Sequence, residues 1–175
     1  MVSMSSSASC RSLSLPVTPL VKRIILASTK GQALFVSREQ RKPFNPYSAY
    51  LFALLQRERR AADGQAMADE HLTESLEIQI PEWQMRAGCI EGITPARAVA
   101  FNTFVTNSFR QRLREEIELR LETTRFLKEA AERALARWGI DEDTYPLSAA
   151  IRHYTRHRSE STGTTDAPTD SLAAA

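Results

Sequence analysis

The sequence predicts a mostly α-helical protein, with about four helices around one long central helix and disordered N- and C-terminal tails. Neither glycine nor proline occurs between Pro95 and Gly139, so one long helix can run over residues 95–138. Apolar residues elsewhere recur at helical spacing, and both ends are too poor in apolar residues to form a core. The predicted organisation is a tail over residues 1–15, a single helical domain over 16–158 and a second tail over 159–175.

The first 15 residues are rich in serine and contain no acidic side chain, a composition typical of a disordered tail. The same composition is typical of an organellar transit peptide, so targeting by residues 1–30 stays open as an alternative. No apolar stretch of sufficient length follows a basic start, which disfavours a secretory signal.

Residues 18–37 fit two structures. Thr18-Pro19 is a capping residue followed by a proline at the first helical position, and Gly31 offers a stop. The alternative is a hairpin with strands over 20–27 and 33–37, which the β-branched content supports. We favour the helix because both boundary signals agree with its period.

Asn45-Pro46 opens an amphipathic helix that Gly64 would end. Its apolar stripe consists of Tyr47, Tyr50, Leu51, Leu54 and Leu55. Phe52 lies about 140° away from Tyr47 on this helix, which makes it a candidate contact for a protein partner.

Residues 65–93 are acidic and weakly periodic, which predicts a loop. Within them, Leu76 to Ile80 alternate between apolar and polar side chains, the pattern of a short strand that Pro81 stops.

The apolar residues of the long helix are spaced four apart, from Phe101, Val105 and Phe109 to Leu113, Ile117 and Leu121. Each step overshoots a full turn by about 40°, so the stripe winds by roughly 200° over five steps. A regular coiled coil is therefore disfavoured. Either different elements pack on successive faces, or the helix breaks near Thr123-Thr124. Phe101 and Phe109 are candidates for an interface with another protein or a second copy.

Tyr145-Pro146 starts a last helix whose polar side is basic, through Arg152, His153, Arg156, His157 and Arg158. This face could contact a nucleic-acid backbone, an acidic partner or the acidic segment of its own chain. His153 and His157 have the i, i+4 spacing of metal ligands, but the zincin glutamate and a third ligand are missing. No metal site is predicted.

Charge is strongly segregated along the 175 residues, although the net charge is only +2. Residues 1–60 hold 10 basic side chains against 2 acidic ones, and residues 61–95 hold 1 against 7.

No apolar run is long enough to span a bilayer. Cys10 and Cys89 match no ligand or disulfide spacing, which favours a reducing, intracellular and cytoplasmic location.

Motifs for catalysis are missing: no phosphate-binding glycine loop, no nucleophile in a recognisable turn and no motif-placed carboxylate pair. We therefore expect neither an enzyme nor a cofactor. The first hypothesis is a small, self-associating assembly protein. The winding apolar stripe of the long helix exposes more surface than a few short elements of the same chain can easily bury, and self-association would bury the rest. The second is a nucleic-acid-binding accessory protein that uses the basic N-terminal region and the basic last helix.

Overall fold

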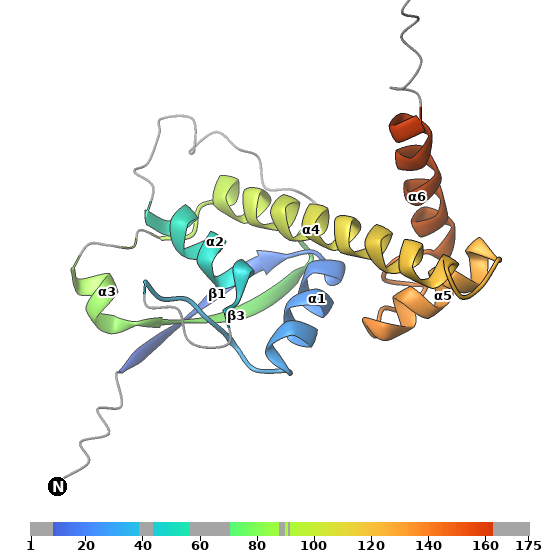
Figure 1. Ribbon diagram of the computed structural model, residues 1–175. Coiled ribbons are helices and arrows are strands. Elements are labelled where there is room, and N and C mark those ends of the chain that lie inside the picture. Colours follow the sequence, from blue (N-terminus) through green and yellow to red (C-terminus); the bar gives the residue numbers. More distant parts are fainter. Residues whose placement is uncertain (1–8, 39–43, 57–70, 88–89, 91, 163–175) are drawn as a thin grey trace, which may run out of the picture.

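The computed structural model describes residues 9–38, 44–56, 71–87, 90 and 92–162. Along these residues the chain forms three strands and six helices (Figure 1). In order they are β1 (Cys10–Val17), α1 (Pro19–Thr29), β2 (Leu34–Phe35), α2 (Pro46–Gln56), β3 (Glu74–Pro81), α3 (Glu82–Arg86), α4 (Pro95–Leu121), α5 (Leu127–Arg137) and α6 (Leu147–Thr162). The prediction of a mostly helical chain with one long central helix is confirmed, but a small sheet is also present.

The sheet has the strand order β1-β3-β2. Strands β1 and β3 pair antiparallel from Cys10 opposite Pro81 to Val17 opposite Glu74, and β2 pairs parallel with β3. Because side chains alternate between the two faces of a strand, one face of the sheet is apolar and buried. The other face is polar, and there Ser12 donates a 2.7 Å hydrogen bond to Glu77.

Strand β1 corrects the prediction of a disordered tail over residues 1–15, of which residues 1–8 lie outside the described part. Ser12, Leu13, Ser14 and Leu15 alternate between polar and apolar side chains, and Leu15 is fully buried. The strand exists because β3, more than 60 residues further along the chain, supplies its hydrogen-bonding partner. The composition of residues 1–15 alone does not show that a distant strand pairs with them.

The two capped starts behave as predicted. Thr18 caps α1 by accepting from the Val21 N–H, and Thr94 caps α4 in the same way, each at 3.3 Å. Helix α1 ends in left-handed backbone at Lys30 and Gly31. The helix is therefore confirmed over the hairpin alternative, although β2 falls inside the second strand of that alternative.

Helix α2 begins where Asn45 predicts it, with the Asn45 side chain accepting from the Tyr47 N–H at 3.0 Å. Its predicted continuation to Gly64 lies outside the described residues. The predicted strand at 76–80 is confirmed as the central part of β3.

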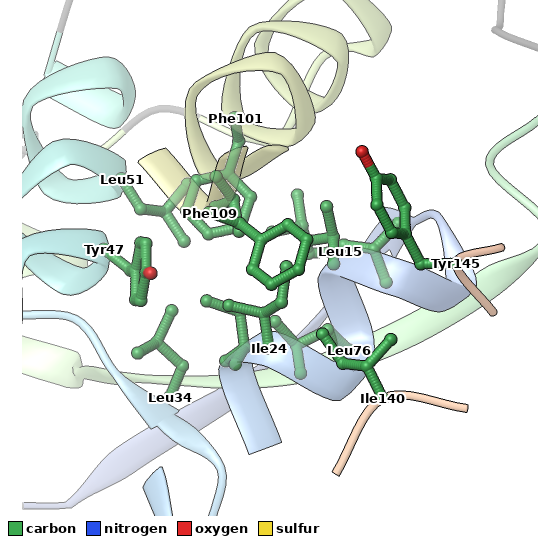
Figure 2. Packing of buried hydrophobic residues seen from close by; sticks show 14 of the residues in the cluster. Leu15, Ile24, Leu34, Tyr47, Leu51, Leu76, Phe101, Phe109, Ile140 and Tyr145 are labelled. Carbon is green, nitrogen blue, oxygen red and sulfur yellow. The ribbon is translucent and has the colours of Figure 1, made fainter. Parts of the chain in front are cut away.

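The core forms where α4 crosses the apolar face of the sheet. From Phe101 to Ile117, the five apolar residues spaced four apart on α4 are at most 1% exposed. Helix α4 contacts β1, α1 and α2, and toward its C-terminal end it lies beside α5 and α6 (Figure 1). Figure 2 shows Phe101 and Phe109 among side chains from the strands, α1 and α2, together with Ile140 and Tyr145 from the segment between α5 and α6. The prediction that different elements pack on successive faces of this helix is confirmed.

The predicted single helix over 95–138 is wrong, because it breaks between Leu121 and Leu127. Thr123 donates through its hydroxyl to the Arg120 carbonyl, and the Thr124 hydroxyl donates to Glu129 at 2.7 Å. Such side-chain bonds compete with the helical backbone pattern. The chain turns there, and α5 packs back against α4.

The α4–α5 contact has an apolar and a charged part. Ala130, Ala131 and Ala134 are fully buried, which allows the two helices to approach closely. At its edge, Glu116 of α4 accepts 2.7 Å bonds from Arg120 and from Arg137 of α5.

Gly139, with a φ of 63°, ends α5 in the left-handed conformation that glycine adopts without strain.

The last helix, α6, extends to Thr162, so residues 159–162 are helical rather than part of the predicted tail. Residues 163–175 lie outside the described part. No described helix is both long and apolar enough to cross a membrane.

Asn102 of α4 completes the end of β1. Its side-chain oxygen accepts from the Thr18 N–H at 2.9 Å, and its side-chain nitrogen donates to the Pro16 carbonyl at 3.1 Å. The same nitrogen also donates to the Ala98 carbonyl at 2.8 Å. This amide thus takes the place of a neighbouring strand at the outer edge of β1, and it fixes α4 to the β1–α1 junction.

Candidate functional site

Helix α6 packs against α5 and against the C-terminal part of α4 (Figure 1), and its Ala150 and Tyr154 are buried. This contact orients the polar side of the helix. His153 is half-buried where α6 meets α4, whereas Arg152 and Arg156 are exposed. The predicted basic residues of α6 therefore lie at and beside the α4–α6 contact.

Two arginines of α4 join this surface. The pKa of His153 is lowered, first by burial and then by the positive charges of Arg110, Arg114, His157 and Arg156. We call these five residues, Arg110, Arg114, His153, Arg156 and His157, the basic cluster. Arg152 and Arg158 are exposed on the same helix but do not contribute to the shift at His153.

No ion pair in the described part of the chain includes Arg110, Arg114, Arg152 or Arg156. Nearby basic residues of α4 and α5 are neutralised instead, as in the pairs Arg120–Glu116 and Arg133–Glu129. The Nε of Arg110 is buried and has no hydrogen-bond acceptor. Like charges thus gather here while opposite charges pair elsewhere.

Two described carboxylates of the acidic segment, residues 61–95, pair with basic residues outside α6. Glu74 accepts from Lys22 at 2.8 Å, and Glu82 accepts from Arg86 at 2.8 Å. Along the described residues, these contacts lie on the sheet and on α3, away from α6 (Figure 1). The predicted alternative of a basic helix covered by residues 61–95 finds no support in them.

A groove of about 540 Å³ lies along α4, and its lining residues Asn107 and Gln111 are each about one helical turn from an arginine of the basic cluster. We call it the amide groove. Its described lining is uncharged and includes Tyr50, Thr103, Phe104, Asn107, Ser108 and Gln111. The Phe104 ring stacks on Tyr50 of α2, with 3.8 Å between ring centroids and 12° between planes.

A second groove, of about 560 Å³, lies between α1, α4 and α5 and contains Arg112, Glu116 and Arg137. Its charges are largely balanced, because Glu116 accepts from Arg137. The Arg112 guanidinium lies 5.8 Å from the centre of the Tyr47 ring. This groove therefore lacks the excess of positive charge found at the basic cluster.

The three candidate interface phenylalanines lie in the core. Phe101 and Phe109 are 0% exposed, and Phe52 is 9% exposed. Phe109 packs edge-on against Trp138 and Tyr145, with ring centroids 5.9 and 5.5 Å apart. Buried residues of α2 lie on more than one side of the helix. Phe52 is therefore buried although it lies outside the apolar stripe predicted from the sequence. These side chains do not form an exposed contact surface.

His153 and His157 lie one turn apart on α6, but no three His, Cys, Asp or Glu side chains gather as a metal site among the described residues. Sequence analysis did not select Arg110 and Arg114 as candidate site residues. A usable signal was their i, i+4 spacing, which places both on one side of α4.

Comparisons of this chain with protein-family models, with curated proteins and with solved structures find no match.

Proposed function

We propose that this protein binds nucleic acid, with the phosphate backbone held by the basic cluster of α4 and α6. The observation that carries the proposal is the packing of α6 on α4, which brings Arg110 and Arg114 near the basic residues of α6, so that their charges lower the pKa of His153. Within the described residues, the arginines of this cluster have no carboxylate partner.

Electrostatics favour a polyanion at such a surface. Arginines that crowd together raise the free energy of the unbound protein by mutual repulsion, and bound phosphates remove that repulsion. The planar guanidinium group also makes two-point contacts with phosphate oxygens. Release of counterions from the nucleic acid adds a favourable, salt-dependent contribution.

The basic cluster replaces the N-terminal region as the proposed contact. Lys22 and Arg23 of that region pair with Glu74 and Asp141, both at 2.8 Å. These pairs lower the local excess of positive charge. The described N-terminal residues therefore offer less attraction to phosphates than the α4–α6 surface does.

The self-association hypothesis started from an unburied apolar stripe on the long helix. That premise is wrong, because the chain itself buries the stripe from Phe101 to Ile117. Self-association stays a prediction, but the apolar stripe no longer supports it. We therefore base the proposed function on the charged surface.

The proposal is tested by fluorescence anisotropy with a labelled single strand of about 15 nucleotides, a length within the usual range of single-strand sites. Binding is measured between about 50 and 200 mM salt for the wild type and for the double variant Arg110→Gln/Arg114→Gln. We expect weaker binding for the variant. Its slope of log affinity against log salt should be shallower by about 1.4, since each lost phosphate contact on a single strand removes about 0.7.

The control is Arg125→Gln/Lys128→Gln, which removes the same charge from exposed positions in the α4–α5 turn and at the start of α5, where Lys128 lies 3.9 Å from Glu132. We expect its salt slope to equal that of the wild type. Equal losses in the two double variants would mean that only net charge matters, and the proposed site would then be wrong.

A further inference from the structure

Beside the basic cluster, α4 presents a polar face that continues directly into the amide groove. At 100° per residue, Thr103, Asn107, Arg110 and Arg114 lie within about 60° of one another around the helix. Asn107 and Arg114 are separated by about 10 Å along the helix axis. One face of α4 therefore joins uncharged hydrogen-bonding groups to guanidinium groups.

The groove has the chemistry that exposed nucleobases need. Asn107 offers both amide donors and an amide acceptor, and Thr103 and Ser108 add hydroxyl groups. The Gln111 side chain donates to Glu115 at 3.1 Å, and its amide oxygen can still accept. Side-chain amides recognise base edges through paired donor and acceptor contacts.

Aromatic rings lie at the same place. Tyr50 and Phe104 are half-buried, stack on each other and line the groove, so a base in the groove lies against aromatic side chains. Surfaces that bind single strands combine a positive track for the backbone with aromatic rings for the bases. A duplex would keep its bases stacked inside and would leave the groove without an occupant.

We infer that the nucleic acid bound by this protein is single-stranded, with at least one base in the amide groove and its phosphates on the basic cluster. This inference rests on the proposed function. The distance of about 10 Å from Asn107 to Arg114 corresponds to roughly three nucleotides of a stacked strand at 3.4 Å each. One short stretch of strand therefore reaches both surfaces.

The test compares two oligonucleotides of equal length and charge, one with thymine bases and one in which the central nucleotides are abasic. Both carry the same phosphates, so only contacts with the bases distinguish them. We expect the wild type to bind the thymine strand about tenfold more tightly, the effect of one stacked base at the lower end of measured values.

The variant Asn107→Ala/Gln111→Ala should lose most of this preference while it keeps the salt slope of the wild type. Phe104→Leu should do the same, and circular dichroism checks that it folds. The double variant keeps the test decisive if Phe104→Leu does not fold, since Asn107 and Gln111 are exposed. Gln32→Ala removes an exposed amide outside the groove and should leave the preference unchanged.

The outcomes separate the two proposals. Equal affinity for the thymine and abasic strands would overturn the inference and leave the proposed function intact. Tighter binding of a duplex, or of inorganic polyphosphate, than of the thymine strand would overturn it as well. Failure to bind any of these polyanions would overturn the proposed function itself.

Discussion

Replacing Asn102 by alanine is expected to destabilise the protein strongly, although the change removes only one small polar side chain. Asn102 is 6% exposed, and its amide bonds the Thr18 N–H, the Pro16 carbonyl and the Ala98 carbonyl. In Asn102→Ala all three bonds disappear at once. The strand β1 and the start of α1 then lose these hydrogen bonds to α4, although their apolar side chains still pack against it.

The size of the effect follows from which groups remain unpaired. The Ala98 carbonyl lies inside α4 and keeps its helical partner, and water can reach the Pro16 carbonyl because Pro16 is exposed. The Thr18 N–H is part-buried and loses its acceptor. A buried donor without a partner costs about 1–3 kcal/mol, and the loss of the other two hydrogen bonds adds to this, so we expect a total of about 2–3 kcal/mol. For a chain of this size that lowers Tm by about 4–12 °C.

Urea denaturation followed by circular dichroism measures this loss. Asn107→Ala is the matched control, since it makes the same change on an exposed side of the same helix. We expect the control to lie within about 0.5 kcal/mol of the wild type. If Asn102→Ala also stays within that margin, the amide does not hold β1 and α4 together, and the described role is wrong.

Three further predictions concern the core, the α4–α5 contact and pH. Phe109→Ala removes a fully buried ring that contacts Trp138, and it should cost about 3–5 kcal/mol in urea denaturation. Glu116→Gln should cost about 1–2 kcal/mol at neutral pH. Hydrogen bonds from Arg137 and Arg120 lower the pKa of Glu116, so its contribution is present above about pH 4.5 and is lost as pH falls. The difference between the two proteins should therefore shrink at about pH 3. Burial and the arginines lower the pKa of His153, so the unfolded chain takes up this proton first as pH falls below about 6.5. Tm should decrease between about pH 8 and pH 5.5, and His153→Gln should reduce the decrease.

The helix starts could be predicted because their signals are local. Thr18, Asn45 and Thr94 each precede a proline, and a cap with its proline depends only on neighbouring residues. The break near Thr123-Thr124 was open as one of two alternatives, and the structure contains both. The chain breaks there, and successive faces of α4 meet different elements.

Strand β1 could not be predicted with the same certainty, because its partner lies more than 60 residues away. Its alternating residues from Ser12 to Val17 were a signal, but serine-rich composition pointed to a tail. Phe101 and Phe109 were offered as interface residues because the sequence does not show how many elements surround α4. Burial by five neighbouring elements is a property of the tertiary structure alone.

The sequence predicted the part of the candidate site on α6 but not the part on α4. The basic side of α6 follows from its helical periodicity, whereas the contribution of α4 depends on how the two helices pack. Arg110 and Arg114 lie close in sequence to the acidic residues of α4. The positive and negative charges therefore nearly cancel when they are counted along that helix. Their i, i+4 spacing places both arginines on one side of α4, but that α6 packs near this side follows only from the three-dimensional structure.

The pKa of His153 with and without a bound strand tests the central claim most directly. The chain has three histidines, so NMR can follow each imidazole, and His153→Gln identifies the signal. Phosphates on the basic cluster should stabilise the protonated imidazole, so we predict that the oligonucleotide raises the pKa of His153. An unchanged pKa at His153 in a protein saturated with the strand would contradict the claim that the phosphates lie on this cluster.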